Sequence, residues 1–150
     1  MIVAIDPGQT GAIATLDGDG WIYVDAMPKG VERQVKFFKA IGNERNFVFI
    51  EDVGSSRPGN SAKSITTFAR HVGNIEAICH LCFGKPTFVQ PKKWMNWLGV
   101  PPAMEKKDRK DFIHKKVNSL TAGRRSKPIA KYAADAVGIL LYAEFLINSI

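Results

Sequence analysis

Short apolar runs, most of them rich in β-branched residues and separated by turn residues, dominate the first half of the chain. They predict buried strands at residues 2–5, 12–16, 21–24 and 47–50, and a short fifth strand at 86–89. Between the second and third runs lies Asp-Gly-Asp-Gly at 17–20, which favours a hairpin because glycine tolerates positive φ. The pattern therefore indicates a sheet whose second and third strands are antiparallel.

Helical spacing of apolar residues follows each later strand. It predicts helices over the following ranges: 31–41, 62–83, 92–98, 105–120 and 130 to about 147. Residues 53–61 read as a loop by composition. Three strands, a helix, a strand, a helix, a strand and then helices predict an α/β fold, with a five-stranded mixed sheet flanked by helices. We find no linker or repeat, so residues 1–150 are interpreted as one domain.

Composition places the chain among globular proteins, with 45% hydrophobic and 23% charged residues. The longest apolar run, 139–143, is far too short to span a membrane, and the first residues do not resemble a signal peptide. We therefore expect a cytoplasmic protein with no membrane partner.

The positive charge is concentrated in one stretch. The formal net charge is +7, yet residues 92–131 alone carry twelve basic and three acidic side chains. Such a patch is typical of proteins that bind a phosphate backbone, and a solvated helix face is the plainer alternative. The interleaved Trp94 and Trp97 favour nucleic acid.

Three carboxylates from distant parts of the chain are candidate catalytic residues. Asp6 and Glu51 each end a predicted strand, and Asp135 lies near the start of the last, apolar helix. Buried carboxylates that approach one another need a cation between them, and Mg²⁺ prefers oxygen ligands. Helix capping and surface ion pairs remain the alternatives at this point.

Several of these residues resemble a known family. Residues 2–11 (IVAIDPGQTG), Glu51 and residues 133–136 (AADA) are similar in order and spacing to the RuvC family of Holliday-junction resolvases, especially its compact phage-type members. The resemblance implies an RNase H-like fold and the cytoplasm of a bacterium or of a phage-infected host. It also implies a Mg²⁺-dependent endonuclease of DNA recombination and repair that nicks four-way junctions as a homodimer. Mn²⁺ is expected to substitute for Mg²⁺, and no nucleotide cofactor is implied.

By this resemblance Asp6 would bridge two metal ions, while Glu51 and Asp135 would each hold one. Tyr132 stands where the family usually has Asp or His, so Tyr132 and its neighbour Lys131 are only possible auxiliary residues. The expected DNA-binding residues come from the loop and the basic segment: Arg57, Asn60, Ser61, Lys63, Lys92, Lys93, Lys106, Lys107, Arg124, Arg125 and Lys127. The alternatives are an RNA-processing nuclease of the YqgF type and a non-catalytic branched-DNA-binding module of the same fold.

Overall fold

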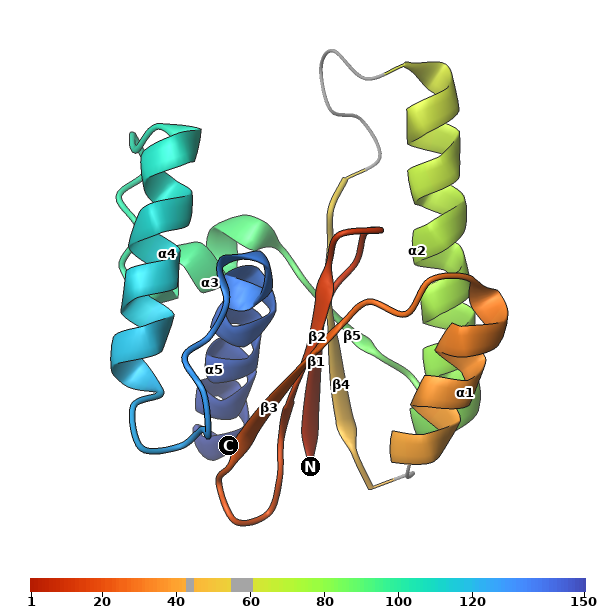
Figure 1. Cartoon of the computed structure of the whole chain (residues 1–150), viewed down its shortest axis with the longest axis horizontal. Coiled ribbons are helices and arrows are strands. Elements are labelled where there is room, and N and C mark those ends of the chain that lie inside the picture. The colour runs from red at the N-terminus through yellow and green to blue at the C-terminus, as the bar shows by residue number, and fades with distance from the viewer. Residues whose placement is uncertain (43–44, 55–60) are drawn as a thin grey trace.

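A computed structural model of the 150-residue chain describes residues 1–42, 45–54 and 61–150. Its strands are β1 (Ile2–Asp6), β2 (Ala12–Leu16), β3 (Ile22–Ala26), β4 (Phe47–Glu51) and β5 (Thr87–Val89). They form one mixed sheet in the order β3-β2-β1-β4-β5 (Figure 1). β1 pairs antiparallel with β2 and parallel with β4, and β5 is parallel to β4. The predicted fold class is confirmed.

The hairpin between β2 and β3 shows why the third strand starts later than the sequence predicts. The carboxylate of Asp17 accepts hydrogen bonds from the backbone N–H of Asp19 and of Trp21, at 3.0 and 2.8 Å. Trp21 is therefore part of the turn, and pairing in β3 begins at Ile22. The N–H of Ile22 then donates to the carbonyl of Arg124, which ties this outer strand to the C-terminal region.

Helices cover both faces of the sheet (Figure 1). On one side lie α1 (Val31–Ile41) and α2 (Ala62–Phe83), and on the other lie α3 (Pro91–Leu98), α4 (Lys106–Leu120) and α5 (Ala134–Asn148). The helix predicted from residue 130 starts instead as a 3₁₀ turn at Lys131–Ala133, so α5 begins one residue before Asp135. Within the described residues no helix is long and apolar enough to cross a membrane.

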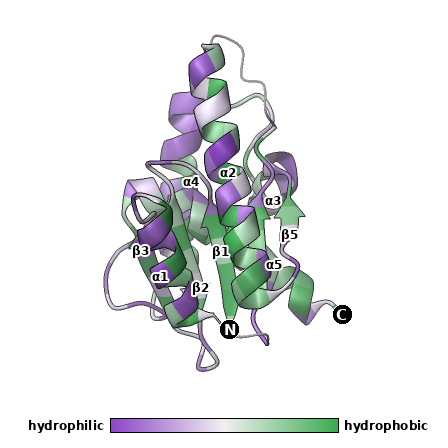
Figure 2. Cartoon of the chain, turned by 90° about the vertical axis from the view of Figure 1, so that its right-hand side faces the viewer, coloured by the Kyte–Doolittle hydropathy of each residue, from purple (hydrophilic) through white to green (hydrophobic). Residues whose placement is uncertain are grey.

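Alternate residues of the central strands pack into two separate hydrophobic cores, one on each face of the sheet. Ala4 and Phe49 pack with α5, whereas Ile5 and Ile50 pack with α1 and α2. Figure 2 shows that hydrophobic residues concentrate in the strands and in α5, while the free end of α2 is largely hydrophilic. This alternation decides on which side of the sheet each strand-end side chain lies.

Candidate active site

The strand register brings Asp6 and Glu51 to the same end and the same face of the sheet. β1 and β4 are parallel and pair Ile5 with Ile50, so the two acids that follow stand at neighbouring positions. Each acid lies two residues after a residue of the α5 core, Ala4 or Phe49, and the period of a strand directs it to that same face. Both carboxylates therefore belong to the side covered by α5.

Asp135 reaches this side from the first turn of α5, which packs against β1 and β2. Burial raises the pKa of its carboxyl group, while Lys110 and then Arg109 act to lower it. The positive end of the helix dipole also favours a negative charge here. Asp135 is thus a poorly solvated carboxylate whose charged form depends on cations nearby.

A cavity of about 520 Å³ joins two of the acids to the basic helix α4. Glu51 and Asp135 line it together with Lys106, Arg109 and Lys110. These three cations lie at helical spacing on the same stripe of α4 as Ile113, which is buried in the α5 core. They line the cavity, while Lys106 and Lys110 are themselves exposed to solvent. Asp6 stands beside Glu51 on the sheet but does not line the cavity. The cavity presents anionic and cationic groups side by side.

A buried tryptophan orients one of the acids. Glu51 is only 7% exposed, and its Oε1 accepts a hydrogen bond of 3.0 Å from Nε1 of Trp94 on α3. The indole packs directly on α5 at Gly138, where a Cβ atom would lie 2.7 Å from the ring. The absence of a side chain at residue 138 therefore sets the position of the indole, which in turn holds the carboxylate.

The donor set suits a hard divalent cation, because Asp6, Glu51 and Asp135 offer only carboxylate oxygens. Among the described residues, however, no three His, Cys, Asp or Glu side chains are already grouped closely enough to hold a metal ion. The predicted ligands are thus gathered on one face, with two of them in one cavity, but they do not form a closed metal cluster.

The two possible auxiliary residues point elsewhere. Tyr132 is half exposed and lines a different cavity, against β3 and the segment 125–130. Lys131 is bonded to Asp111 at the surface, and this pairing is the main cause that lowers the pKa of Asp111. Tyr132, the residue at the position expected for a fourth metal ligand, therefore does not line the cavity of Glu51 and Asp135. Arg109 and Lys110 from α4 line that cavity instead.

The residues predicted to bind DNA divide into three groups. Arg57 and Asn60 lie outside the described residues. The exposed group comprises Lys63, Lys92, Lys93, Lys106, Lys107 and Lys127. Ser61, also exposed, caps α2 by accepting the N–H of Ser64 at 3.2 Å. Arg124 and Arg125 form a third group, because their guanidinium groups bond within the protein.

Arg124 bonds both oxygens of Glu144, at 2.7 and 3.0 Å, and donates through Nε to the carbonyl of Gly20. Arg125 donates to the hydroxyl of Thr121 and to the carbonyl of Asn118. These two arginines therefore fasten the segment after α4 to its neighbours. We leave them out of the candidate DNA surface.

Sequence reasoning missed three residues of the cavity. Arg109 and Lys110 were counted only as charges, although their spacing to Ile113 and Val117 marks the inward stripe of the helix. Trp94 is expected from the sequence only to favour nucleic-acid binding, as one of two tryptophans among the basic residues. It is buried, and the partner of its N–H lies 43 residues away in sequence, so no local pattern could have assigned it.

The fold of this chain matches that of known protein structures. No protein-family model and no curated protein matches the sequence. Among solved structures, the RuvC structure from Thermus thermophilus matches with a TM-score of 0.62 and 16% sequence identity, covering 99% of this chain and 95% of that one. T. thermophilus RuvC in complex with Holliday junction substrate matches with a TM-score of 0.63 and 14% identity, over the same shares. The chain therefore shares the fold of these two RuvC structures over nearly its whole length.

Proposed function

We propose that this protein is a metal-dependent endonuclease that nicks branched DNA, four-way junctions in particular, and acts as a homodimer. One observation carries the proposal: Glu51 and Asp135 share a cavity with Lys106, Arg109 and Lys110, at the end of the sheet where Asp6 also stands. Carboxylates and cations that line one cavity suit the cleavage of a phosphodiester. The fold shared with RuvC, which has been solved with a Holliday junction, supports this choice of substrate.

In this proposal Asp6, Glu51 and Asp135 hold Mg²⁺, with Mn²⁺ as a substitute. When bound, the metal would supply an activated water and would neutralise charge on the phosphate. The remaining steps belong to the side chains of the protein. Arg109 and Lys110 contact the oxygens of the scissile phosphate, and the indole N–H of Trp94 keeps Glu51 facing the cavity.

In this proposal, exposed lysines next to the cavity bind the phosphate backbone of the DNA. Lys92 and Lys93 stand on the first turn of α3, while Lys107 stands on α4. Such contacts neutralise phosphates without reading bases, so they strengthen binding to every DNA shape. Two strands of a junction must be cut, and a homodimer supplies one active site for each of them.

The test is Mg²⁺-dependent nicking of a synthetic four-way junction beside matched duplex, single-stranded DNA and structured RNA. We expect nicking of the junction by the wild type, and its loss in Asp6→Asn, Glu51→Gln and Asp135→Asn. Junction affinity should persist in all three, because each change removes an anion that repels phosphates. Near-wild-type nicking by any two of the variants would contradict the assigned site. Preferential cleavage of the RNA would favour the YqgF-type alternative.

A non-catalytic branched-DNA-binding module is the second candidate. The absence of a closed metal cluster among the described side chains favours it, as does a tyrosine at position 132 that faces away from the cavity. The same assay separates the two candidates. Tight junction binding by the wild type, without nicking in either Mg²⁺ or Mn²⁺, would establish the module and exclude the nuclease.

A further inference from the structure

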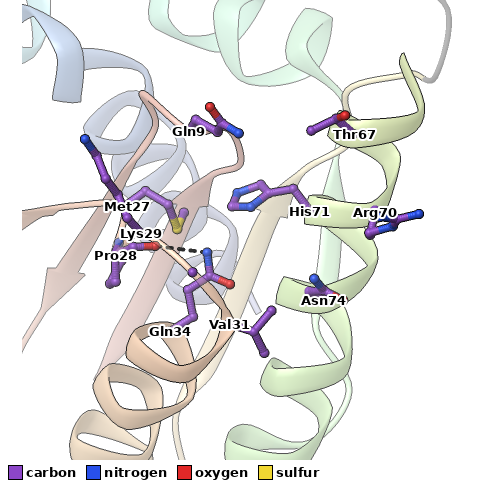
Figure 3. A pocket seen from close by; sticks show the side chains of 11 residues that line it. Gln9, Met27, Pro28, Lys29, Val31, Gln34, Thr67, Arg70, His71 and Asn74 are labelled. Atoms are coloured by element: carbon purple, nitrogen blue, oxygen red, sulfur yellow. Dashed lines mark hydrogen bonds between the residues drawn. The ribbon is translucent and has the colours of Figure 1, made fainter. Parts of the chain in front are cut away.

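A second cavity lies on the opposite side of the sheet from the candidate active site. It has a volume of about 360 Å³ and is enclosed by the β1–β2 turn, the segment between β3 and α1, and α2 (Figure 3). None of the three carboxylates or the α4 cations lines it. Its size falls in the range of cavities that bind small organic groups.

The cavity contains a buried acceptor without a partner. Gln34 on α1 is 2% exposed, and its Nε2 donates to the carbonyl of Pro28 at 3.0 Å. That bond fixes the orientation of the amide, so Oε1 is the atom left over. Within the described part of the chain Oε1 has no hydrogen-bond partner. A buried acceptor in this state calls for a ligand that donates an N–H or O–H.

A second unpartnered atom lies across the cavity. His71 of α2 points from the helix toward the β1–β2 turn (Figure 3), and its Nε2 also has no partner among the described residues. Burial lowers the pKa of its imidazole, which therefore stays neutral near pH 7. A neutral imidazole nitrogen either donates or accepts, depending on its tautomer. The cavity thus offers two polar atoms from two helices to one ligand.

The charged and apolar side chains that line the cavity limit the chemical class of ligand that it can bind. Lys29 and Arg70 are exposed residues of its lining, and no Asp or Glu lines it. Met27 and Val31 supply apolar surface. A matching ligand carries N–H donors on an otherwise flat, partly apolar body, and a negative charge at its outer end. A nucleotide combines these features, because its base bears N–H groups and its phosphate is anionic.

The neighbouring surface favours a nucleotide that belongs to a strand. A second hollow of about 400 Å³ shares Gln9, Thr67 and His71 with the first and continues to Ser61 and Lys63. Gln9 follows Asp6 by three residues in the β1–β2 turn. A strand that occupied the second hollow would bring its next base to Gln34 and its phosphates to exposed cations.

We propose that this cavity binds one unpaired nucleotide, with a base N–H donated to Oε1 of Gln34, the base edge at His71, and phosphate beside Lys29. Where the proposed nuclease function holds, the nucleotide is one displaced from a branched substrate. Free mononucleotides have the same chemistry and are the other possible source.

The experiment measures binding without divalent metal, so that its result does not depend on cleavage. One arm titrates the four deoxynucleoside monophosphates, with deoxyribose 5-phosphate as the control that lacks a base. The other arm compares a branched DNA carrying one unpaired nucleotide with the same DNA carrying an abasic site there. We expect the base to strengthen binding about tenfold in at least one arm. Preference in the DNA arm identifies a strand as the source, and preference in the mononucleotide arm alone identifies free nucleotide.

Substitutions of residues that line the cavity test whether the preference for a base arises there. Gln34→Met and His71→Phe remove the two polar atoms at similar volume, and Lys36→Met on the exposed side of α1 is the matched control. We expect the preference for a base to disappear in the first two and to persist in the third. Equal binding with and without a base by the wild type in both arms would overturn the proposal. A preference retained by both Gln34→Met and His71→Phe would overturn it as well, even if junction nicking were normal.

Discussion

Oε1 of Glu51 and Nε1 of Trp94 lie 3.0 Å apart, which couples the end of a central strand to a helix on the α5 side of the sheet. Trp94→Phe keeps most of the ring packing but removes this donor. We expect a loss of about 1.5–3 kcal/mol in the free energy of unfolding. We also expect a higher metal concentration for half-maximal nicking, because Glu51 is no longer oriented.

Thermal unfolding and a Mg²⁺ titration of the nicking rate measure these two effects. Trp97→Phe is the matched control on the same helix, since Trp97 packs at the surface against Tyr142 and Phe145. Identical metal dependence of the Trp94 and Trp97 variants would show that the indole of Trp94 plays no part in positioning the acid.

Gly138→Ala should disturb the hydrogen bond between Trp94 and Glu51 from the α5 side of the indole ring. The new methyl group would lie 2.7 Å from the Trp94 ring, so the indole must shift. We expect a destabilisation of about 1–3 kcal/mol together with slower nicking. Gly73→Ala in α2 is the control: an added Cβ there meets no atom within 4 Å, and the change should stabilise the fold by about 0.5–1 kcal/mol. Chemical denaturation of both variants tests the contrast.

Asp135→Asn should stabilise the metal-free protein at neutral pH while abolishing nicking. The folded-state pKa of Asp135 is raised above 3.8, so the folded state holds the proton more tightly than the unfolded state. The contribution of Asp135 to the free energy of unfolding is therefore most favourable at low pH, and it falls as pH rises through the window between 3.8 and the raised value. Asparagine removes this penalty.

The measurement for Asp135 is the melting temperature in EDTA between pH 3.5 and 7. The advantage of the variant over the wild type should be present at pH 7 and shrink toward pH 3.5. An advantage that stays constant with pH would refute the assigned cause.

Two lysines on α4 should behave differently. Lys110 lines the cavity of Glu51 and Asp135, whereas Lys107 does not. Replacing either with alanine should make the slope of log affinity against log salt shallower, by about 0.9 for each lost duplex-phosphate contact. Only Lys110→Ala should also slow nicking of bound junction, by about tenfold or more. Single-turnover rates on saturating protein separate the effects, and equal rates for the two variants would argue against a role for Lys110 in the chemical step.

Arg124→Ala should affect stability more than DNA binding. The guanidinium bonds both oxygens of Glu144 and the carbonyl of Gly20, and is partly exposed. We expect a loss of about 1–2 kcal/mol in the free energy of unfolding. Junction affinity should stay close to that of the wild type at temperatures where the variant is folded. A Lys92→Ala variant should instead lose junction affinity while its free energy of unfolding stays close to that of the wild type. Weaker junction binding by folded Arg124→Ala would show that Arg124 does contact DNA.

The sequence predicted the parts of the site that depend on local periodicity. Apolar runs located the strand ends at Asp6 and Glu51, and the period of two residues explains why both face α5. The helical stripe through Ile113 also contained the information that Lys106 and Arg109 lie on the side of α4 that borders the cavity. Positions on regular elements are predictable because a side chain's direction follows from its place in the repeat.

Contacts between distant segments were beyond such reasoning. The bond between Trp94 and Glu51 and the ion pair of Arg124 with Glu144 depend on how helices pack on the sheet. Tyr132 is a possible auxiliary residue only because the family resemblance implies an Asp or His at its position, three residues before the last acid. The 3₁₀ turn at Lys131–Ala133 precedes α5, and Tyr132 faces the cavity beside β3 instead. Sequence distance alone did not reveal that change of direction.

The outer strands restrict how two copies of this protein could associate. β5 is only three residues long, and the first residue of β3 already gives its backbone N–H to the carbonyl of Arg124. Short or capped edges are poor templates for strand addition from another molecule. A homodimer would therefore pack through helices and loops rather than by joining two sheets, and surface substitutions on the helices would be the way to separate its subunits.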